Sequence, residues 1–305
     1  MSIGFGLGIA GFPFSDMGAF LRWIDLCDTS GVDSVWFSER LVSTSPALEP
    51  IATFGVVAGR TERLKFGMNA IVLPLRDPLV LAKQCATLDF LSGGRLLPAF
   101  GVGSELSPEF RSTGRRPEGR GRRSDEMIQI MSRLWSEEHV SFEGKHFQYE
   151  DVTISPRPVQ QPLPLWIGGS SDAAVRRTAT LGTGWLGGVQ TPKQVAPVIA
   201  KIRAATAEAG RTIDTDHYGA GFPFRFGSFD EPVVERTARA YSRIGEGIEP
   251  DEYMGVGGAD DIAARAEEYI AAGVSKFVLR PIADSDAEMM SQTQRLVAEV
   301  VPRFR

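Results

Sequence analysis

The fold is decided by three consecutive stretches, which read RLKFGMNAIVL (63–73), DPLVLAKQCATLDFLSGG (77–94) and RLLPAFGVG (95–103). The first and third stretches are short and mostly apolar, which is typical of strands buried on both faces of a parallel sheet. The middle stretch has the length of a helix and ends in two glycines, which favour a helix stop. Together they predict a strand–helix–strand unit in which the two strands run parallel.

The same alternation continues along the chain in both directions. Strands are predicted at 3–9, 33–38, 63–73, 95–103, 165–169, 184–188, 216–224 and 274–281, and each is followed by a predicted helix. Eight such units favour a closed (β/α)8 barrel, a TIM barrel, over an open doubly wound sheet. No GxGxxG motif follows the first strand, which further weakens the doubly wound alternative. We therefore predict a single α/β domain over residues 1–305.

Two segments interrupt this alternation. VSFEGKHFQYEDV (140–152) alternates around Glu143 and Gly144, so it predicts a β-hairpin inserted between the fourth and fifth strands. The segment 245–258 is rich in glycine and predicts a mobile loop. The helices on either side of this loop are predicted at 231–244 and 259–272.

Composition and charge narrow the class of protein. Apolar residues make up 43% of the 305 residues and charged residues 23%, which is ordinary for a globular chain with a large core. The formal net charge of −5 gives no indication of a nucleic-acid partner or of an anionic membrane surface. No apolar run is long enough to span a bilayer, and the glycine-containing N-terminus is typical of a first strand rather than a signal peptide.

The cysteines and histidines predict no metal site. Cys27 and Cys85 lie far apart in apolar helical contexts, which favours buried thiols in a reducing compartment and a cytoplasmic protein. His139, His146 and His217 lack the spacing of zinc ligands. The chemistry is therefore expected from other residue types.

In a barrel, catalytic residues come from the C-terminal ends of the strands and from the loops that follow them. This rule selects a short set of candidates. They are Glu39 and Arg40 after the second strand, Asn69, Ala70 and Ile71 in the third, Gly103, Ser104 and Glu105 after the fourth, Gly168, Gly169 and Ser170 after the fifth, and Gly187 and Gly188 after the sixth. The eighth strand ends at Arg280.

Each group of candidates has a functional and a structural interpretation. Glycine pairs let backbone N–H groups approach a phosphate at a helix N-terminus, but glycines also simply shorten strand–helix turns. Glu39 or Glu105 suits a general acid or base, and Arg40 suits the stabilisation of a negative charge. An ordinary salt bridge at the rim of the sheet explains each of these three residues more simply.

An arginine-rich run connects the fourth strand to the next helix. Its arginines stand at positions 111, 115, 116, 120, 122 and 123, interleaved with Glu109, Glu118, Asp125 and Glu126. The simpler interpretation is a solvated connection whose charges pair with one another. The functional interpretation is a clamp on an anionic cofactor tail or substrate.

These residues also carry a resemblance to a known family. The runs DPLVLAKQCATLDFLSGGRLLPAFGVGSE (77–105) and GRGRRSDEMIQIMSRLWSEEHVSFEGKHFQYEDVTISPRPVQQPLPLWIGGSSDAAVRRTATLGTGWLGG (119–188) resemble the signature of the bacterial luciferase-like monooxygenases. The resemblance covers about residues 30–190. The last third is similar only in pattern, with AGVSKFVLRP (272–281) typical of the eighth strand.

The resemblance implies a TIM barrel with FMN, or the deazaflavin coenzyme F420, lying across the strand ends. It implies a cis peptide bond without proline at the end of the third strand, and the matching bond here is Ala70–Ile71. It also implies that Gly168, Gly169 and Ser170 hold the cofactor phosphate, and that Glu105 acts as an acid or base.

One position departs from the family. Many relatives have histidine after the acidic residue of the second strand, whereas this chain has Arg40. Arginine stays protonated, so it stabilises charge but is a poor proton shuttle. Glu39 and Glu105 remain the candidate proton carriers.

The resemblance supports three hypotheses. The first is F420-dependent hydride transfer to a small organic substrate, and the second is a two-component monooxygenase that receives reduced FMN from a separate flavin reductase. The third is a catalytically silent flavin-binding relative. A homodimer is expected by analogy with the family. The candidates for an apolar pocket over the cofactor ring, or else for the core, are Phe12, Phe14, Trp36, Phe222 and Phe224.

Overall fold

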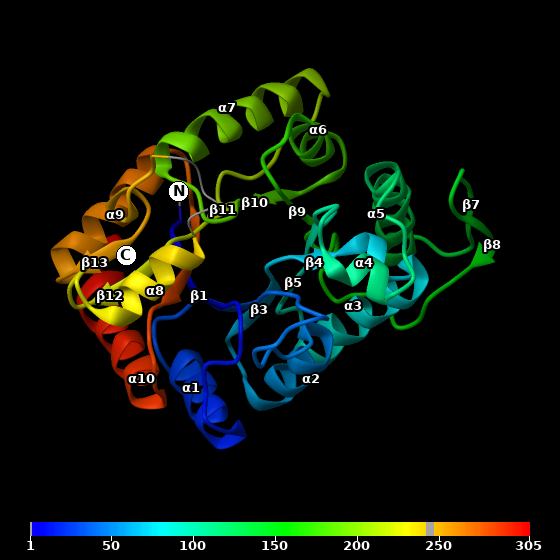
Figure 1. Cartoon of the computed structure of the whole chain (residues 1–305). Helices are drawn as coiled ribbons and strands as arrows, with labels where there is room; N and C mark the ends of the chain where they lie inside the picture. Colours follow the sequence, from blue (N-terminus) through cyan, green and yellow to red (C-terminus); the bar gives the residue numbers. More distant parts are fainter. Residues whose placement is uncertain (1, 242–246) are drawn as a thin grey trace.

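Residues 2–241 and 247–305 are described by the computed structural model, in which short parallel strands form one curled sheet (Figure 1). The strands are β1 (Gly4–Ile9), β2 (Ser34–Phe37), β3 (Lys65–Met68), β4 (Ile71–Val72), β5 (Leu96–Leu97), β6 (Ala99–Gly101), β9 (Trp166–Gly168), β10 (Gly184–Leu186), β11 (Tyr218–Ala220), β12 (Pro223–Phe226), β13 (Gly255–Gly257) and β14 (Lys276–Pro281). Neighbours pair in the order β4-β6-β9-β10-β11-β14-β1-β2-β3-β5, and β12 also pairs with β13 and β14.

The path of pairing begins and ends on two interrupted strands. Only Asn69 and Ala70 separate β3 from β4, and only Pro98 separates β5 from β6. Since β3 pairs with β5 while β4 pairs with β6, both ends of the path belong to the same two interrupted strands. The predicted α/β fold with a parallel sheet is therefore confirmed in its coarse form, as a sheet that curls back on itself.

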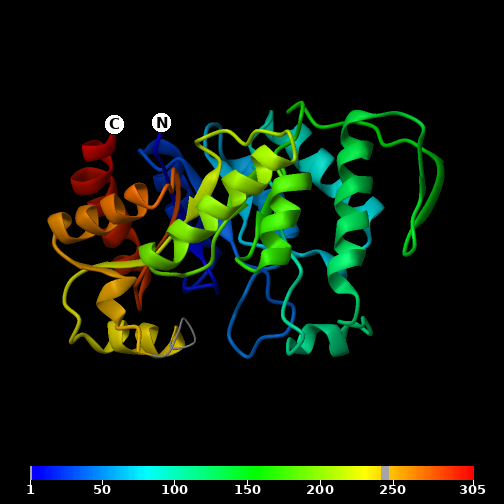
Figure 2. The same ribbon diagram turned by 90° about the horizontal axis from the view of Figure 1, so that it is seen from above.

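Helices cover the outer face of the curled sheet (Figures 1 and 2). They are α1 (Met17–Thr29), α2 (Pro50–Arg60), α3 (Pro78–Ser92), α4 (Pro108–Ser112), α5 (Arg120–Ser136), α6 (Asp172–Leu181), α7 (Pro192–Glu208), α8 (Pro232–Ala240), α9 (Ala259–Ala271) and α10 (Asp286–Arg295). A capping side chain begins several of them, as in α3, where Asp77 accepts the Leu79 N–H at 2.9 Å and Gly93 at φ 66° ends the helix. Of the helices that the structure describes, none is both long and apolar enough to cross a membrane.

Trp36 of β2 fills the interior of the sheet between glycines of its two neighbouring strands. An atom at the Cβ position of Gly67 in β3 would lie 2.5 Å from the indole ring, and one at Gly6 in β1 would lie 2.8 Å from the indole nitrogen. The ring is fully buried, and its Nε1 donates to the Ser34 hydroxyl at 2.9 Å. Only glycine at these two positions leaves room for the ring.

Trp166 of β9 repeats this arrangement on another part of the sheet. A Cβ atom at Gly184 in β10 would lie 2.7 Å from its ring, and one at Gly219 in β11 would lie 2.8 Å away. The rings of Trp36 and Trp166 are 6.0 Å apart between centroids, so the two tryptophans meet inside the curled sheet. Large and small residues on adjacent strands thus fill the interior together.

Residues Val140–Glu143 (β7) and Gln148–Val152 (β8) form a separate antiparallel pair. This pair lies between α5 and β9 in the sequence and extends away from the curled sheet in Figures 1 and 2. Its tip is attached to α5, because the Glu126 carboxylate accepts the N–H groups of Lys145 and His146 at 3.0 and 2.8 Å.

The chain after β11 differs from the prediction. The segment 216–224 holds two strands rather than one, because a Cβ atom at Gly221 would lie 1.9 Å from the Val278 carbonyl oxygen and the backbones touch there. The helix predicted at 231–244 is observed as α8, and residues 242–244 lie outside the described residues.

The loop predicted at 245–258 also lies partly outside the described residues. Pro250–Glu252 form a short 3-10 turn, η3, and Gly255–Gly257 form β13, which pairs with β12, so the loop prediction is wrong for these residues. The glycines there allow close packing instead, since a Cβ atom at Gly255 would lie 2.8 Å from the Phe222 ring.

Replacing Gly67 with alanine tests the packing of Trp36. We expect Gly67→Ala to lower the free energy of unfolding by roughly 1–3 kcal/mol, the usual cost of overpacking a core. Gly59→Ala is the control, because a Cβ atom at this exposed position in α2 has no neighbour within 4 Å. The control is expected to keep or slightly raise stability. Urea unfolding measures both variants, and equal midpoints would contradict the role of Gly67.

Candidate functional site

A cleft of about 580 Å³ opens where the C-terminal ends of several strands meet. Its walls come from segments far apart in the sequence, namely the ends of β1, β2, β10 and β14, the start of α4 and the end of α8. The lining residues are Ala10, Ser38, Glu39, Arg40, Val42, Ser107, Pro108, Glu109, Val189, Ala240, Tyr241 and Arg280. The structure thus brings Glu39 and Arg40 together with Glu109 and Arg280.

Glu39, two residues after β2, is held in a buried ion pair. Its side chain is 1% exposed and bonds to Arg76, whose Nε lies 3.1 Å from one carboxylate oxygen. The other oxygen accepts the Val72 N–H at 2.7 Å. Burial raises the pKa of Glu39, and the Arg76 charge and the Val72 hydrogen bond oppose this rise. Glu39 therefore fixes β4 and the turn after it rather than presenting a free carboxylate to the cleft.

Glu109, in the first turn of α4, presents its carboxylate to the same cleft. Burial acts to raise its pKa, but the hydrogen bonds from the Ser107 hydroxyl and from backbone N–H groups, together with the Arg40 charge, bring the pKa below its usual 4.5. At neutral pH Glu109 is therefore an ionised carboxylate, able to accept a proton.

Glu105, the predicted acid or base, is not among the residues that line the cleft. Its side chain is 68% exposed and pairs with Arg120 at 2.5 Å. Sequence reasoning selected Glu105 and missed Glu109 because the two lie four residues apart in one connection. The available signal was Pro108, which suits the first position of a helix and places Glu109 in its first turn.

Small residues meet at the ends of three neighbouring strands. They are Ala70 between β3 and β4, Gly101 at the end of β6, and Gly168 at the end of β9. A Cβ atom at Gly168 would lie 3.5 Å from the Ala70 Cβ, and one at Gly101 would lie 3.9 Å from it. We call these three half-buried residues the rim platform. None of its three residues carries a side chain longer than a methyl group.

The peptide bond between Asn69 and Ala70 is cis. The resemblance placed this bond at Ala70–Ile71, so the predicted position is wrong by one residue. Ile71 is fully buried and pairs with Phe100 in the sheet, so it belongs to the core rather than to the platform. Asn69 is half-buried and precedes Ala70 of the platform.

The turn after β6 packs against this segment. Gly103 has a left-handed conformation at φ 68°, and a Cβ atom there would lie 2.8 Å from Val72 Cγ1. Ser104 is exposed, and its hydroxyl accepts the Leu106 N–H at 3.3 Å. Gly103 thus contacts the residue whose N–H group Glu39 binds.

The turn after β9 leads from the platform into α6. The Gly169 carbonyl, at φ 109°, accepts the Trp185 Nε1–H at 2.8 Å, and the Ser170 hydroxyl donates to Gln190 Oε1 at 2.7 Å. Ser171 caps α6 directly afterwards. The N–H groups of a first helical turn lack partners within the helix, so this turn fits an anionic group such as a phosphate.

The two glycines after β10 differ in role. Gly187 is buried, and a Cβ atom there would lie 2.7 Å from the Trp185 ring, so this glycine serves core packing. Gly188 is exposed, and a Cβ atom there has no neighbour within 4 Å. Gly188 therefore leaves open space beside Val189, which lines the cleft.

The arginine-rich run forms fewer ion pairs between its own residues than the sequence indicated. Arg120 pairs with Glu105, but Asp125 pairs with Arg177 of α6 at 2.5 Å. Arg123 donates instead to the Arg116 carbonyl at 3.1 Å. The connection is therefore tied to the neighbouring helix as well as to itself.

Most aromatic residues proposed for an apolar pocket belong to the core. The buried ones are Phe14, Trp36, Phe222 and Phe224. Phe12 lines a second cleft of about 300 Å³, which shares Ala10, Tyr241 and Arg280 with the first. The core interpretation therefore holds for four of these five residues.

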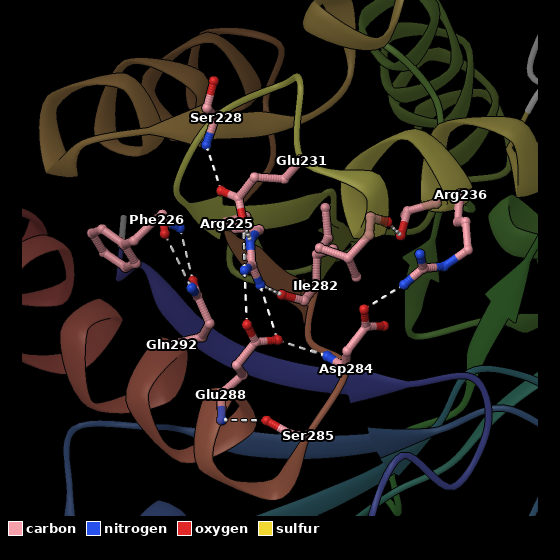
Figure 3. Close-up of polar contacts among 12 residues, drawn as sticks. Arg225, Phe226, Ser228, Glu231, Arg236, Ile282, Asp284, Ser285, Glu288 and Gln292 are labelled. Carbon is pink, nitrogen blue, oxygen red and sulfur yellow. Dashed lines mark hydrogen bonds and ion pairs between the residues drawn. The ribbon is translucent and has the colours of Figure 1, made fainter.

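A network centred on Arg225 holds the α8 wall of the cleft (Figure 3). Arg225 of β12 is 7% exposed and bonds to Glu231 at 2.6 Å, to Glu288 at 2.9 Å and to the Ile282 carbonyl at 2.8 Å. Glu231 stands at the start of α8 and Glu288 lies in α10. The Arg225 guanidinium holds the pKa of both carboxyls below their usual values. The network therefore fixes α8 to the segment that follows Arg280.

The α8 wall also has an apolar cluster of its own. Val233 and Val234 of α8 pack with residues near β13 and after β14, apart from the main core. The other buried members are Tyr253, Met254, Val256 and Ile282. Tyr241 packs against this cluster and lines the cleft.

The sequence was compared with models of known protein families. The model of the luciferase-like monooxygenase family matches residues 10–286. The chain belongs to this family. Its members share the fold described above, and the predicted resemblance is thus confirmed.

Two relatives illustrate the sequence neighbourhood of this luciferase-like protein. An uncharacterized protein of Mycobacterium tuberculosis is 33% identical over 176 residues, which is 57% of this chain and 60% of that relative's length. An F420-dependent glucose-6-phosphate dehydrogenase of Kineococcus radiotolerans is 25% identical over 309 residues, covering 91% of this chain and 90% of the relative.

Two solved structures share the fold. A monooxygenase, RslO1 of Streptomyces bottropensis, has a TM-score of 0.87 at 21% identity, with 99% of this chain and 100% of that chain covered. An F420-dependent secondary alcohol dehydrogenase has a TM-score of 0.86 at 18% identity, with both chains fully covered. At these identities the likeness shows the fold alone.

Substitution of Glu39 tests its positioning role. We expect Glu39→Gln to lower the free energy of unfolding by about 3 kcal/mol, because it leaves the buried Arg76 guanidinium partly uncompensated. Glu105→Gln is the matched control, since its exposed pair contributes less than about 1 kcal/mol. Chemical unfolding measures both variants. An equally small effect of the two substitutions would show that the Glu39 pair does not hold the rim.

Proposed function

We propose that this luciferase-like protein is an oxidoreductase that uses the deazaflavin coenzyme F420 to transfer hydride to or from a small organic substrate. The observation that carries the proposal is the Glu109 carboxylate in a cleft next to the rim platform. Glu39 connects the two, because it lines the cleft and binds the Val72 N–H two residues after Ala70. Two F420-dependent glucose-6-phosphate dehydrogenases, at 25% and 26% identity over some nine-tenths of this chain, support the choice of cofactor.

The residues at the strand ends fit such a cofactor. The platform of Ala70, Gly101 and Gly168 offers a surface without long side chains, which suits the flat deazaflavin ring. The turn at Gly169 and Ser170 leads into the N-terminus of α6, which suits the cofactor phosphate. When bound, the deazaflavin supplies a carbon that accepts or donates hydride.

The chain's own contribution is to bind the substrate and to move a proton. Glu109 is ionised at neutral pH, so it is suited to take the proton of a substrate hydroxyl as hydride leaves the adjacent carbon. Arg40 remains charged and stabilises negative charge on substrate oxygen. Glu39 positions this surface through its bond to Val72 rather than by carrying a proton.

The placement of the site at the strand ends rests on a barrel interpretation of the sheet. We count β3 with β4, β5 with β6, and β11 with β12 as three interrupted strands, which gives eight strand units along the path of pairing, with β13 attached outside it through β12. The β7–β8 hairpin is then an insertion between the fourth and fifth units. The active sites of such barrels lie at the C-terminal ends of the strands, where the cleft is found.

The second candidate is a two-component monooxygenase supplied with reduced FMN by a separate reductase. It is favoured by the family as a whole, whose model describes luciferase-like monooxygenases. The platform and the phosphate-binding turn serve FMN as well as a deazaflavin. The third candidate, a catalytically silent relative, differs from both in predicting no turnover. A cytoplasmic location and a homodimer stay predictions.

Cofactor binding separates these candidates. The purified protein is titrated with FMN and with F420, each oxidised and reduced, and tighter binding of F420 without oxygen consumption is expected. Preferential binding of reduced FMN with oxygen consumption would favour the monooxygenase. Binding of neither cofactor would reject the proposal.

The platform is tested by filling it. We expect Gly101→Leu to weaken F420 binding by at least about tenfold, equivalent to 1.4 kcal/mol, because the added side chain occupies the ring's place. Gly59→Leu, on the exposed surface of α2, is the control and is expected to leave affinity unchanged. Fluorescence titration measures affinity and thermal unfolding confirms that both variants fold. Equal F420 affinities of the two variants would show that the cofactor ring does not lie on the platform.

Glu109→Gln tests the proton acceptor. We expect a fall in kcat of roughly 10²–10⁴-fold with cofactor affinity retained, whereas Glu105→Gln keeps most of the activity. Because the pKa of Glu109 lies below 4.5, kcat/KM for substrate oxidation should lose Glu109-dependent activity only when the pH falls below that value. A profile of kcat/KM against pH for the wild-type enzyme checks this loss of activity at low pH. Equal activity of the Glu109→Gln and Glu105→Gln variants would show that Glu109 transfers no proton.

A further inference from the structure

Two guanidinium groups of the cleft form no ion pair with any residue that the structure describes. Arg40 follows β2 and Arg280 lies in β14, and both line the cleft. Across residues 2–241 and 247–305, other arginines of the site are paired, such as Arg76 with Glu39 and Arg225 with Glu231. Arg40 and Arg280 have no such carboxylate among these residues.

Arg280 has a buried donor without a partner among the described residues. Its Nε is buried and has no hydrogen-bond acceptor in the part of the chain that the structure describes. Its Nη1 lies 3.5 Å from the Tyr241 hydroxyl, and its guanidinium carbon lies 5.9 Å from the centre of the Tyr241 ring. Buried donors in folded proteins are nearly always paired. The described part of the chain therefore supplies no acceptor for the Arg280 Nε–H group.

The charged groups of the lining differ in whether they already have partners. Glu39 pairs with Arg76, which also pairs with Glu49, so these three groups form a network of their own. Glu109 is the remaining carboxylate of the lining, and its charge acts on Arg40 without a direct ion pair. Among the described residues Arg280 has no carboxylate partner, so an anion in the cleft would supply the acceptor that its buried Nε lacks.

The position of the two arginines assigns this anion to the substrate. The rim platform and the phosphate-binding turn lie at the ends of β3, β6 and β9, whereas Arg280 belongs to β14 and Arg40 follows β2, which pairs with β3. In the order of pairing, β10 and β11 separate β9 from β14. The arginines share their cleft with Glu109, the proposed proton acceptor. A molecule that reaches both would place a reacting carbon near Glu109 and an anionic group near Arg280.

We propose that Arg40 and Arg280 bind a carboxylate or phosphate group of the substrate, so that the enzyme acts on small organic anions. Guanidinium groups bind both kinds of anion through paired N–H donors. The Tyr241 hydroxyl lies within reach of the same group. This inference rests on the proposed function for its reaction, but the anion site itself stands on the geometry of the cleft.

The walls of this anion site are held in place before any ligand binds. Arg225 bonds to the start of α8 through Glu231 and to the carbonyl of Ile282, two residues after Arg280 (Figure 3). Arg236 of α8 forms a further ion pair with Asp284. The helix that carries Tyr241 and the strand that carries Arg280 are thus joined twice. A site fixed in this way binds a small anion with little reorganisation.

The test measures binding of inorganic phosphate and of acetate to the cofactor-free full-length protein by calorimetry at low salt. We expect Arg280→Met to weaken binding by about tenfold or more, and Arg40→Met to weaken it several-fold. Arg280→Lys, which keeps the charge, should restore part of the affinity. Arg122→Met removes an exposed arginine outside the cleft and should change nothing. Unchanged binding in both cleft variants, or an equal loss in Arg122→Met, would overturn the proposal.

A second arm identifies the source of the anion. F420 affinity is measured in the same variants, and it should be unchanged while KM rises for alcohols that carry a carboxylate or phosphate. A parallel loss of F420 and phosphate binding in Arg280→Met would assign the site to the cofactor and overturn the substrate assignment. If the wild-type protein binds no F420, the proposed function fails, and the phosphate titrations still decide the anion site.

Discussion

The packing of two tryptophans against glycines of adjacent strands is the constraint on which the rest of the structure depends. Trp36 and Trp166 fill the interior of the curled sheet, and their neighbouring strands have no room for side chains at that level. A third tryptophan, Trp185, extends this packing to the rim, because its Nε1 holds the Gly169 carbonyl. The turn that leads into α6 is therefore positioned by the core as well as by its own hydrogen bonds. Groups placed on such rigid supports keep the geometry that a reaction requires.

Charged residues at the rim divide into those that hold the backbone and those that face the cleft. Glu39 pairs with Arg76 and accepts the Val72 N–H, and Arg76 also pairs with Glu49, so these groups order the segment beside the platform. Arg225 does the same for α8. Glu109 and Arg280 are left to interact with whatever enters the cleft. The chemical character of the site thus follows from which charges the fold has already neutralised.

The alternating apolar runs predicted the parallel sheet and its helices well, because burial on both faces leaves a clear pattern in the sequence. The site was predicted less completely. Glu105 was chosen over Glu109 because the path of a connection depends on contacts, such as Ser107 with Glu109, that no periodicity records. The strand at 255–257 was missed because its glycines resemble a loop until Phe222 is placed against them. The partner of Asp125, Arg177, lies 52 residues away, beyond any local rule.

The α8 wall has an apolar cluster of its own and is tied to β12 and α10 by ion pairs around Arg225. Its packing is therefore separate from that of the tryptophan-filled interior of the curled sheet. Glu109 and the rim platform lie outside this wall, whereas Tyr241 lies on it beside the cleft. Arg280 lies where the two parts meet, because it belongs to β14 and its guanidinium approaches the Tyr241 hydroxyl. The cleft is thus a boundary between two separately packed apolar clusters, and a shift of either one would alter its shape.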